Sequence, residues 1–331
     1  MRYKKLGTTD MKVSEITIGT WAIGGAGWGE VDRKQSIDAI HQMVDHGVNF
    51  IDTAPAYNSG MAECVVGEAI RNIRDKIYIA TKGGVTNIGN HTVRDSSEEN
   101  LFKQCEESLK RLQVDYLDLY MIHWPDYNVP FEETFTAMEK LKKQGKIRHI
   151  GVSNFSVPQT LDAERYAQID VIQIPYSMVN RSQERFLKWF HDHKIGVMTY
   201  GSLSGGILTG AFRTRPKFAA GDIRPAAYDA FVEPKFSRAM EILKTLDTIA
   251  EKHNVPVAQV TINWNLKKEF VDTALVGVIN PQQADENCEC MDWELTEVEM
   301  EVIDKKIEDV LGDQETYCRQ TNNPWAVGYR D

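Results

Sequence analysis

The segment NFIDTAPAYNSG, residues 49–60, runs from a short apolar stretch into Asp52 and then into a loop that contains Pro55, Tyr57 and Gly60. The apolar stretch is typical of a buried strand, and a carboxylate at its end needs a partner or a ligand for its charge. Two questions follow: which fold ends a strand in an acid, and what a tyrosine does five residues later.

An upstream glycine-rich segment, GGAGWGE at residues 24–30, offers one answer, the phosphate loop of a Rossmann domain with Asp52 on the ribose of a dinucleotide. Gly25 and Gly27 supply a G-x-G, but the third glycine of that fingerprint falls on Glu30. A glutamate there would face the pyrophosphate and prevent close packing of the helix on the strand. We therefore interpret residues 24–30 as a loop that follows a first strand.

The rest of the chain alternates short apolar segments with stretches of helical period. Residues 33–46, 96–112 and 131–144 each place apolar side chains on one helical face. Eight β-then-α units in about 280 residues predict a parallel sheet, and their number in one chain favours a closed (β/α)₈ TIM barrel over an open doubly wound sheet. The predicted strands are EITIG ending at Gly19, VNFID at Asp52, KIYIATK at Lys82, YLDLYMIH at His123, IRHIGVSN at Asn154, DVIQI around Gln173, IGVMTY at Tyr200 and TALVGV at Val278.

The two ends of the chain depart from this repeat. The segment YKKLGTTDMKVS predicts an N-terminal β-hairpin around Gly7–Asp10. An extra C-terminal helix is predicted over 296–310, where Thr296 and Glu299 form a capping box. The same pattern, at Ser96 and Glu99, predicts the start of the helix over 96–112.

Two further segments lack helical or strand periodicity. Residues 201–233 form a long connection with Gly, Pro and Ala, and loops of that length in compact domains usually have a function. Residues 312–331 form a C-terminal tail with aromatic residues but no period. Because no linker or low-complexity tract interrupts the chain, we expect a single domain over 1–331.

Composition excludes several classes of function. The 331 residues carry 38 Lys and Arg against 48 Asp and Glu, a net charge of −10, which argues against a nucleic-acid binder or a membrane-surface protein. No apolar run approaches the roughly 20 residues that span a bilayer. Five scattered cysteines, Cys64, Cys105, Cys288, Cys290 and Cys318, are typical of reduced thiols, and we expect a cytoplasmic protein.

Three of the predicted strands end in titratable residues, Asp52, Lys82 and His123. In a β/α barrel the active-site groups project from the carboxyl ends of the strands, so these side chains should converge, and Tyr57 can bend back over them. A tyrosine hydroxyl has a pKa near 10 and is a poor acid unless a cation stabilises its phenolate, which Lys82 can do while Asp52 holds Lys82 in place. His123 can donate a hydrogen bond to a carbonyl oxygen. The set predicts a general acid for a developing alkoxide.

The sequence gives less support to a hydrolase or a metal-dependent enzyme. The sequence has no G-x-S-x-G turn for a hydrolase nucleophile. We predict no metal site, because the histidines of HDH at 191–193 are two residues apart on a helical stretch and point in different directions.

These residues and the segments around them resemble the aldo-keto reductases, and the resemblance extends over nearly the whole length of the chain. The segment NFIDTAPAYNSGMAECVVGEAI is similar to the first signature of that family. The segments IATKGG, YMIHWPD, GKIRHIGVSNF and GVINPQQADEN follow in the family order. The resemblance implies a (β/α)₈ barrel that binds NADPH or NADH without a Rossmann domain.

The resemblance also implies residue roles. Asp52, Tyr57, Lys82 and His123 would be the catalytic tetrad. Tyr200 would stack on the nicotinamide ring, and the segment 201–233 would cover the pyrophosphate. The remaining cofactor contacts would be Ser153, Asn154 and Gln173 on the carboxamide, Gly201 and Leu203 in the covering loop, and Gly277, Gln283, Glu286 and Asn287 toward the adenosine.

The sequence departs from the family at two positions. Ala62 replaces the Ser or Thr that commonly precedes Glu63. Ile279 stands where NADPH-preferring members often carry Arg or Lys for the 2′-phosphate, so NADH is a plausible cofactor. Arg213, Arg215 and Lys217 in the long connection could supply the missing charge.

We expect an oxidoreductase that reduces an aldehyde or ketone, such as a sugar or a small carbonyl, to an alcohol. The alternative is a non-catalytic nicotinamide-binding sensor or subunit on the same barrel, and a homo-oligomer is compatible with either. Trp21, Trp28, Trp124 and Tyr127 lie in predicted loops that should form the rim of the substrate pocket.

Overall fold

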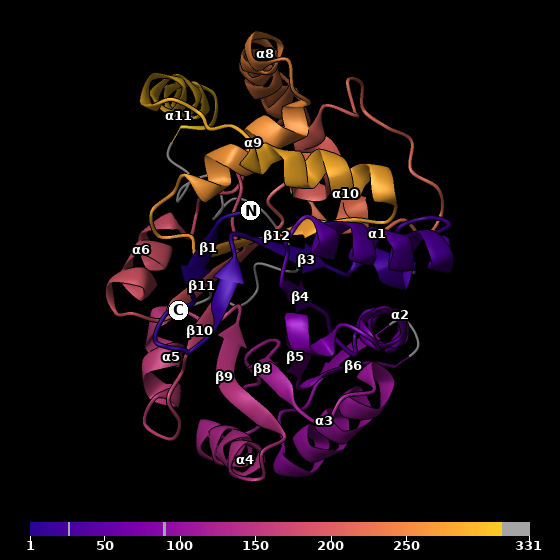
Figure 1. Ribbon diagram of the computed structural model, residues 1–331. Coiled ribbons are helices and arrows are strands. Elements are labelled where there is room, and N and C mark those ends of the chain that lie inside the picture. The colour runs from indigo at the N-terminus through magenta and orange to yellow at the C-terminus, as the bar shows by residue number, and fades with distance from the viewer. Residues whose placement is uncertain (26, 89–90, 313–331) are drawn as a thin grey trace.

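Eight parallel strands form a closed barrel in the computed structural model, which describes residues 1–25, 27–88 and 91–312 (Figure 1). The order around the barrel is β10-β11-β12-β3-β4-β5-β8-β9, so strands that follow one another along the chain are neighbours in space. The predicted (β/α)₈ TIM barrel is confirmed, as are its eight strands. They are β3 (Ile16–Gly19), β4 (Phe50–Asp52), β5 (Tyr78–Gly83), β8 (Leu117–Ile122), β9 (Ile147–Ser153), β10 (Val171–Pro175), β11 (Gly196–Tyr200) and β12 (Thr273–Gly277).

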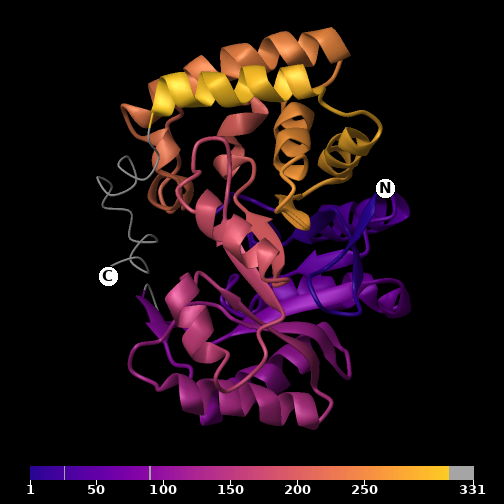
Figure 2. The ribbon, with the colours of Figure 1, turned by 90° about the vertical axis from the view of Figure 1, so that its left-hand side faces the viewer.

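Helices surround the barrel, and most of them contribute apolar side chains to the core between strands and helices. Two long helices, α8 (Lys235–His253) and α11 (Glu297–Leu311), lie side by side outside this ring (Figure 2). None of the helices in the described part of the chain is long and apolar enough to cross a membrane. The other helices are α1 (Arg33–Asp45), α2 (Met61–Ile70), α3 (Glu98–Leu112), α4 (Phe131–Lys143), α5 (Val157–Ala163), α6 (Glu184–Asp192), α7 (Arg224–Ala227), α9 (Val257–Leu266) and α10 (Pro281–Cys288).

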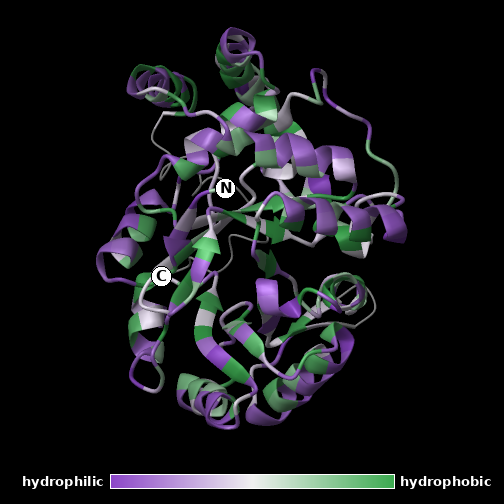
Figure 3. Cartoon of the chain, viewed as in Figure 1, coloured by the Kyte–Doolittle hydropathy of each residue, from purple (hydrophilic) through white to green (hydrophobic). Residues whose placement is uncertain are grey.

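The apolar core has two parts, because side chains of a strand point alternately to its two faces. The larger part lies between the strands and the surrounding helices. Figure 3 shows the consequence: helices carry hydrophobic and hydrophilic residues on different faces, while most strands are hydrophobic. The smaller part fills the barrel interior and consists of Leu6, Met11, Val13, Phe50, Ala80, Leu119, Met121, Val171, Met198 and Leu275.

An antiparallel hairpin of β1 (Tyr3–Lys5) and β2 (Lys12–Ser14) covers the end of the barrel where the strands begin (Figure 1). Its residues Leu6, Met11 and Val13 belong to the interior core, so the hairpin closes this end with apolar side chains. The turn passes so near β11 that a Cβ at Gly7 would lie 2.3 Å from the backbone nitrogen of Gly196. The hairpin predicted around Gly7–Asp10 is therefore confirmed.

A second hairpin, β6 (Val85–Ile88) and β7 (His91–Arg94), follows β5 and was not predicted. It sits at the opposite end of the barrel, beside the segment that follows β8, where the Arg94 guanidinium donates to the Pro125 carbonyl oxygen at 3.1 Å. The sequence signal was the dipeptide Gly-Asn at 89–90 between two short runs, a pattern typical of two-residue hairpins.

The two predicted capping boxes have different outcomes. Thr296 and Glu299 cap α11 reciprocally, as predicted. The prediction for Ser96 is wrong: α3 is capped by Ser97, whose side chain accepts from the backbone nitrogen of Asn100. The Ser96 backbone nitrogen instead donates to the Asp126 carboxylate at 3.0 Å, so the helix begins one residue later.

The long connection 201–233 contains three short helical segments: η3 (Ser204–Thr209), α7 (Arg224–Ala227) and η4 (Asp229–Phe231). Phe212, Phe218 and Phe231 pack edge to face, with ring centroids 4.9 to 6.1 Å apart, which gives the segment a small apolar cluster of its own. The predicted tail 312–331 lies outside the described residues except for Gly312.

Candidate active site

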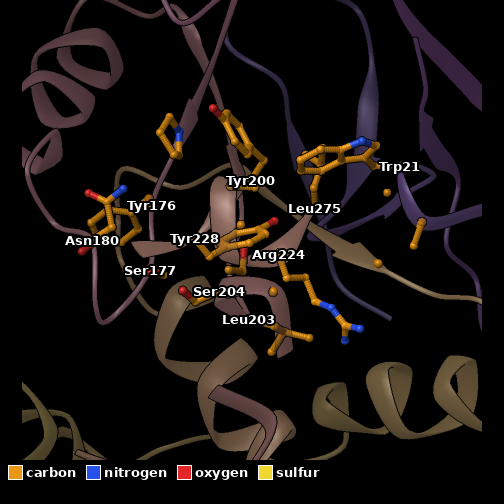
Figure 4. Close-up of a pocket in the computed structure, with 18 of the residues that line it drawn as sticks. Trp21, Tyr176, Ser177, Asn180, Tyr200, Leu203, Ser204, Arg224, Tyr228 and Leu275 are labelled. Atoms are coloured by element: carbon orange, nitrogen blue, oxygen red, sulfur yellow. The ribbon is translucent and has the colours of Figure 1, made fainter. Parts of the chain in front are cut away.

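A cavity of about 2130 Å³ opens at the carboxyl ends of the strands (Figure 4). Such a volume accommodates a dinucleotide and a small substrate together, because pockets for drug-sized ligands alone measure roughly 300–1,000 Å³. Of the predicted site residues, only Lys82 and Tyr127 are not among those that line it. The lining residues that the sequence predicted are Trp21, Trp28, Asp52, Tyr57, His123, Trp124, Ser153, Asn154, Gln173, Tyr200, Gly201, Leu203, Gly277, Gln283, Glu286 and Asn287.

Lys82 lies under the cavity floor and connects two of its residues. Its Nζ is 2.6 Å from the Asp52 Oδ1 and donates to the Tyr57 hydroxyl at 3.2 Å. A third bond, of 3.0 Å, goes to the Thr53 carbonyl oxygen, which uses the remaining proton of the ammonium. The Lys82 and Asp52 side chains are 0% and 1% exposed, so the pair is sealed from solvent.

Tyr57 reaches this pair because the loop after β4 turns back on itself. Asn58, Ser59 and Gly60 all have positive φ angles of 48°, 52° and 86°, and such a left-handed run reverses the chain. The Tyr57 ring packs against Trp21 at a centroid distance of 6.1 Å and against the edge of His123 at 5.9 Å. The phenol is thus held between the ammonium below it and aromatic rings beside it.

Burial controls the titration of these groups. Burial raises the pKa of Asp52 and lowers that of Lys82, in each case against the attraction of the other. Burial and the Asp52 charge hold the pKa of Tyr57 well above 10. The argument from a nearby cation implied a lowered pKa for Tyr57, and the direction is the opposite because the phenol is buried and lies near the Asp52 carboxylate.

His123 follows β8 directly and is neutral at pH 7. Burial and the Lys82 and Arg94 charges together hold the pKa of His123 well below 6.5. Its Nδ1 is buried and has no hydrogen-bond partner in the described part of the chain. A neutral imidazole donates one N–H, which suits a hydrogen bond to an uncharged carbonyl oxygen.

A continuous hydrogen-bonded chain links the tetrad to the residues predicted for the carboxamide. Gln173 donates to the Asp52 Oδ2 at 2.8 Å, and its carbonyl oxygen accepts from Ser153 at 3.1 Å. Asn154 donates to the His123 carbonyl oxygen at 3.0 Å and accepts from the Tyr200 hydroxyl at 2.8 Å. These bonds fix the amide of Asn154, which has a positive φ of 64° that asparagine tolerates.

The predicted adenosine contacts lie on and before α10. The Gln283 side chain accepts from the Ile279 backbone nitrogen at 3.0 Å, and Asn287 donates to the Gly277 carbonyl oxygen at 3.3 Å. Glu286 lines the cavity and accepts from Gln282 at 2.9 Å. This end of the cavity therefore presents a carboxylate and amides.

Three of the four aromatic residues that were predicted at the rim of the pocket line the cavity, and the fourth does not. Trp21 and Trp28 meet edge to face at 5.3 Å, and the Arg94 guanidinium lies 5.1 Å from the Trp124 ring. The prediction for Tyr127 is wrong: its side chain is 63% exposed, it is not among the lining residues, and its hydroxyl accepts from Gln159.

Sequence reasoning missed several lining residues from the long connection. Tyr228 packs its ring 6.5 Å from Trp21 and 6.4 Å from Trp28, which completes an aromatic wall (Figure 4). Ser202 has a buried hydroxyl without a hydrogen-bond partner among the described residues, and both Ser202 and Arg224 line the cavity. No periodic signal could have identified them, because the segment lacks one.

The described residues contain no group of three or more His, Cys, Asp and Glu that could hold a metal ion. Cys64, Cys105, Cys288 and Cys290 are free thiols, whereas Cys318 lies outside the described residues. Burial raises the pKa of Cys105 and of Cys288 to about 12, so these thiols are unreactive.

Comparison with known proteins agrees with this geometry. The family model described as "Aldo/keto reductase family" matches residues 15–308. The chain is 38% identical to the aldo-keto reductase YhdN of Bacillus subtilis (strain 168) over 95% of this chain and 96% of that protein. It is 31% identical to the NADH-specific methylglyoxal reductase of Escherichia coli (strain K12), over 90% of this chain and 96% of that protein.

Among solved structures, the glycerol dehydrogenase AKR11B4 from Gluconobacter oxydans is similar, with a TM-score of 0.86 and 33% identity over 94% of this chain and 96% of that chain. This chain and that protein are therefore similar in both fold and sequence over nearly their whole lengths. The chain belongs to the aldo/keto reductase family and is an oxidoreductase of that family.

Proposed function

We propose that this enzyme uses a nicotinamide cofactor to reduce an aldehyde or ketone to an alcohol, with Tyr57 as the general acid. The observation that carries the proposal is the contact of 3.2 Å between the Lys82 ammonium and the Tyr57 hydroxyl at the cavity floor. When bound, the cofactor supplies the hydride that adds to the carbonyl carbon. The protein supplies the proton and the groups that orient it.

The proton moves from the Tyr57 hydroxyl to the carbonyl oxygen, where negative charge develops. The raised pKa of Tyr57 keeps the phenol protonated until negative charge develops on the carbonyl oxygen. Once the phenol has given it up, the Lys82 ammonium stabilises the phenolate, and Asp52 keeps the ammonium in position. Neutral His123 donates a hydrogen bond to the same oxygen.

The residues that line the cavity fit a nicotinamide dinucleotide. The Ser202 hydroxyl, which has no hydrogen-bond partner among the described residues, can donate to a phosphate oxygen, and Gly205 and Gly206 also line the cavity, with positive φ angles of 67° and 97°. Ser153, Asn154 and Gln173 would hold the carboxamide, and Tyr200 would stack on the ring. Gly201, Leu203, Gly277, Gln283, Glu286 and Asn287 would complete the contacts.

We expect NADH to serve at least nearly as well as NADPH. Ile279 lines the cavity. The family resemblance implies that it would lie near a 2′-phosphate, and burying that group without a cation is costly. The Arg213 guanidinium is bound to the Asp247 carboxylate by two hydrogen bonds, of 2.8 and 2.7 Å, so its charge is already paired. Neither Arg215 nor Lys217 is among the described residues that line the cavity. The NADH specificity named for the Escherichia coli relative agrees with this expectation.

The cofactor experiment is Ile279→Arg. We expect the wild-type enzyme to prefer NADPH by no more than about tenfold in kcat/KM, and the variant to shift the ratio toward NADPH by roughly 1–3 kcal/mol, the worth of a hydrogen bond to a charged group. Ile279→Gln, which adds length without charge, is the matched control. A thousandfold preference of the wild-type enzyme for NADPH would contradict this expectation.

The substrate pocket supports a small, partly polar carbonyl compound. Trp21, Trp28 and Tyr228 offer aromatic faces, and the Trp28 Nε1 is a buried donor without a hydrogen-bond partner among the described residues. The named substrates of two relatives, methylglyoxal and glycerol, are of this size. A panel of dicarbonyls, hydroxyaldehydes and apolar aldehydes, followed by NADH and NADPH absorbance, tests the proposed reaction.

The alternative is a non-catalytic nicotinamide sensor or subunit. The assembled tetrad argues against it, because a sensor does not need a buried ammonium under a phenol. Titration of the cofactor into the protein separates the two: tight binding with no turnover on the whole panel, in either direction, would favour the sensor. Turnover that Tyr57→Phe abolishes would favour the enzyme.

A further inference from the structure

Glu63 is a buried carboxylate on α2, outside the barrel wall, and it takes no part in the proton transfer proposed above. Its two oxygens have different partners. Oε1 accepts a hydrogen bond from the Thr81 hydroxyl at 2.6 Å, and Oε2 accepts one from the Arg111 Nε, also at 2.6 Å. The arginine side chain is 22% exposed and the glutamate side chain 0%. A charge buried so completely is costly unless it is paired, so both bonds hold the carboxylate in one position.

The bond to Thr81 attaches Glu63 to the strand that carries Lys82. Neighbouring side chains of a strand point to opposite faces, and in β5 Ile79 belongs to the outer core while Ala80 belongs to the interior core. Thr81 therefore points outward, toward α2, and Lys82 points inward, toward the cavity floor. The hydroxyl bond thus holds β5 at the residue immediately before the ammonium.

The partner arginine of Glu63 lies against the loop that carries Tyr57. α2 begins directly after that loop, and the Ala62 backbone nitrogen donates to the Tyr57 carbonyl oxygen at 3.4 Å. Gly60 ends the left-handed run of the loop, and a Cβ on it would lie 2.6 Å from the Arg111 Nε. A glycine is required there because the arginine side chain occupies the space.

Arg111 comes from the last turn of α3, which lies beside α2 outside the barrel (Figure 1). The helices approach so closely that a Cβ at Gly67 would lie 2.4 Å from the Arg111 carbonyl oxygen. The other carboxylate near this guanidinium, Glu107, is 3.6 Å from Nη1 and 44% exposed, so Glu63 is the closer and more buried partner. The cluster of Glu63, Thr81 and Arg111 therefore joins α2, β5 and α3 at one point.

The distance between phenol and ammonium depends on this junction. The Lys82 Nζ is 3.2 Å from the Tyr57 hydroxyl, and its two shorter bonds go to Asp52 and Thr53, at the end of β4. Those two bonds join β5 to β4 and do not hold the loop after them. Burial lowers the pKa of Lys82, and the charges of Asp52 and Glu63 act in the opposite direction, so Glu63 also favours the charged ammonium.

We propose that Glu63 is a positioning residue that fixes the distance between the Tyr57 phenol and the Lys82 ammonium. It acts from outside the barrel, through Thr81 on one side and Arg111 on the other. The inference rests on the proposed function, because the distance matters to turnover only if Tyr57 transfers a proton. A misplacement of about 1 Å can cost about 100-fold in rate, so loosening the junction should lower kcat. Cofactor affinity should not change, since the proposed cofactor contacts come from other loops.

Thr81→Val is the first test, because it removes one hydrogen bond to Glu63 and keeps the ion pair with Arg111. We expect kcat for carbonyl reduction to fall roughly 10-fold, with the Kd of NADH within about twofold of wild type. Thr81→Ser, which keeps the hydroxyl, should retain kcat within about threefold. A bond that serves only stability would lower the midpoint of urea unfolding and leave kcat unchanged, and that result would overturn the proposal.

A similar ion pair near the other end of β5 provides the matched control. The Asp118 carboxylate, 3% exposed, accepts from the Ile79 backbone nitrogen at 2.9 Å and from Arg74 at 2.8 Å, and the Arg74 side chain is 21% exposed. Arg111→Gln and Arg74→Gln should therefore lower the urea midpoint by similar amounts. Only Arg111→Gln should lower kcat. Equal losses of kcat in the two variants would show a general effect of stability and overturn the assignment.

A double-mutant cycle tests whether the effect on rate passes through the phenol. Without the Tyr57 hydroxyl there is no distance left to fix, so Thr81→Val should change the residual kcat of Tyr57→Phe by less than about twofold. A full tenfold loss on top of Tyr57→Phe would overturn the proposal. If one of Thr81→Val and Arg111→Gln does not fold, the other decides. Wild-type protein that turns over no carbonyl compound would refute the proposed function itself, whereas an active wild type with an equally active Thr81→Val refutes only the role of Glu63.

Discussion

The substitution Lys82→Met separates what the buried ion pair does for stability from what it does for catalysis. Methionine keeps much of the length of lysine but removes the charge that faces Asp52, whose carboxylate is 1% exposed. The carboxylate keeps its bond of 2.8 Å from Gln173 and loses the ammonium at 2.6 Å. Breaking one side of a buried pair leaves an uncompensated charge, which typically costs about 3–5 kcal/mol.

The double variant Asp52→Asn/Lys82→Met provides the control. An uncharged amide at position 52 removes the orphaned charge, so the free energy of unfolding should recover by at least about 2 kcal/mol relative to Lys82→Met alone. Both variants should be inactive, since neither can stabilise the Tyr57 phenolate. Urea unfolding followed by tryptophan fluorescence gives the stabilities, and cofactor absorbance gives the rates.

The pH dependence gives a second, independent signature. Burial raises the pKa of Asp52 even beside Lys82, and removing the cation can only raise it further. A carboxyl whose folded pKa lies above its unfolded value favours the folded state at low pH, and that contribution is lost as pH rises through the folded pKa. The stability deficit of Lys82→Met should therefore grow as the pH rises from about 4, the unfolded pKa of an aspartate, through the folded pKa. Equal stability of the single and double variants across this range would refute the reasoning.

Three further predictions concern the acid, its pH range and the far end of the barrel. Tyr57→Phe should bind NADH within about twofold of wild type and lose roughly 10²–10⁴ in kcat, and retention of more than about a tenth of kcat would exclude its role. The pKa of Tyr57 is raised, so the phenol keeps its proton at neutral pH. We therefore expect kcat for reduction to stay level from about pH 6 to about pH 9, and a fall centred near pH 7 would contradict this. Burial lowers the pKa of His149, but the hydrogen bonds to Asp170 and Asp10 raise this pKa by more. The protonated imidazole therefore stabilises the fold below the unfolded pKa of histidine, and this contribution is lost as pH rises through the folded pKa. His149→Gln should accordingly cost more unfolding free energy at pH 6 than at pH 9 in urea titrations, and an equal or larger cost at pH 9 would contradict the assignment.

The strands, and the convergence of Asp52, Tyr57, Lys82 and His123, could be predicted because both depend on local patterns. A strand that is buried on both faces is nearly continuously apolar, so a polar residue at its end stands out, as Asp52 and Lys82 do. The parallel arrangement then places the carboxyl ends together without further information. The direction of the Tyr57 pKa could not be predicted, because it depends first on how completely the fold buries the phenol and then on the nearby Asp52 charge, and no sequence pattern encodes either.

The long connection escaped prediction for a physical reason as well. Tyr228, Ser202 and Arg224 face the cavity because the chain folds over its own cluster of phenylalanines and bonds to Gly27. These contacts are nonlocal and follow no period, so composition alone could identify the segment as functional but could not assign its residues. The shift of the α3 cap to Ser97 has the same origin, since the Asp126 carboxylate that binds Ser96 comes from another loop.

The proposed catalytic residues also show how one strand pattern can serve stability and function together. Phe50, Ala80 and Met121 belong to the interior core, and Asp52, Lys82 and His123 each follow one of them by two residues. Because side chains two positions apart share a face of a strand, each polar group points inward directly above an apolar one. The registers Asp52↔Ala80 and Lys82↔Met121 carry this alternation across three neighbouring strands. The apolar layer that closes the barrel is therefore also what removes water from the Lys82–Asp52 pair, so the burial that shifts the pKa values of the site follows from the packing of the core beneath it.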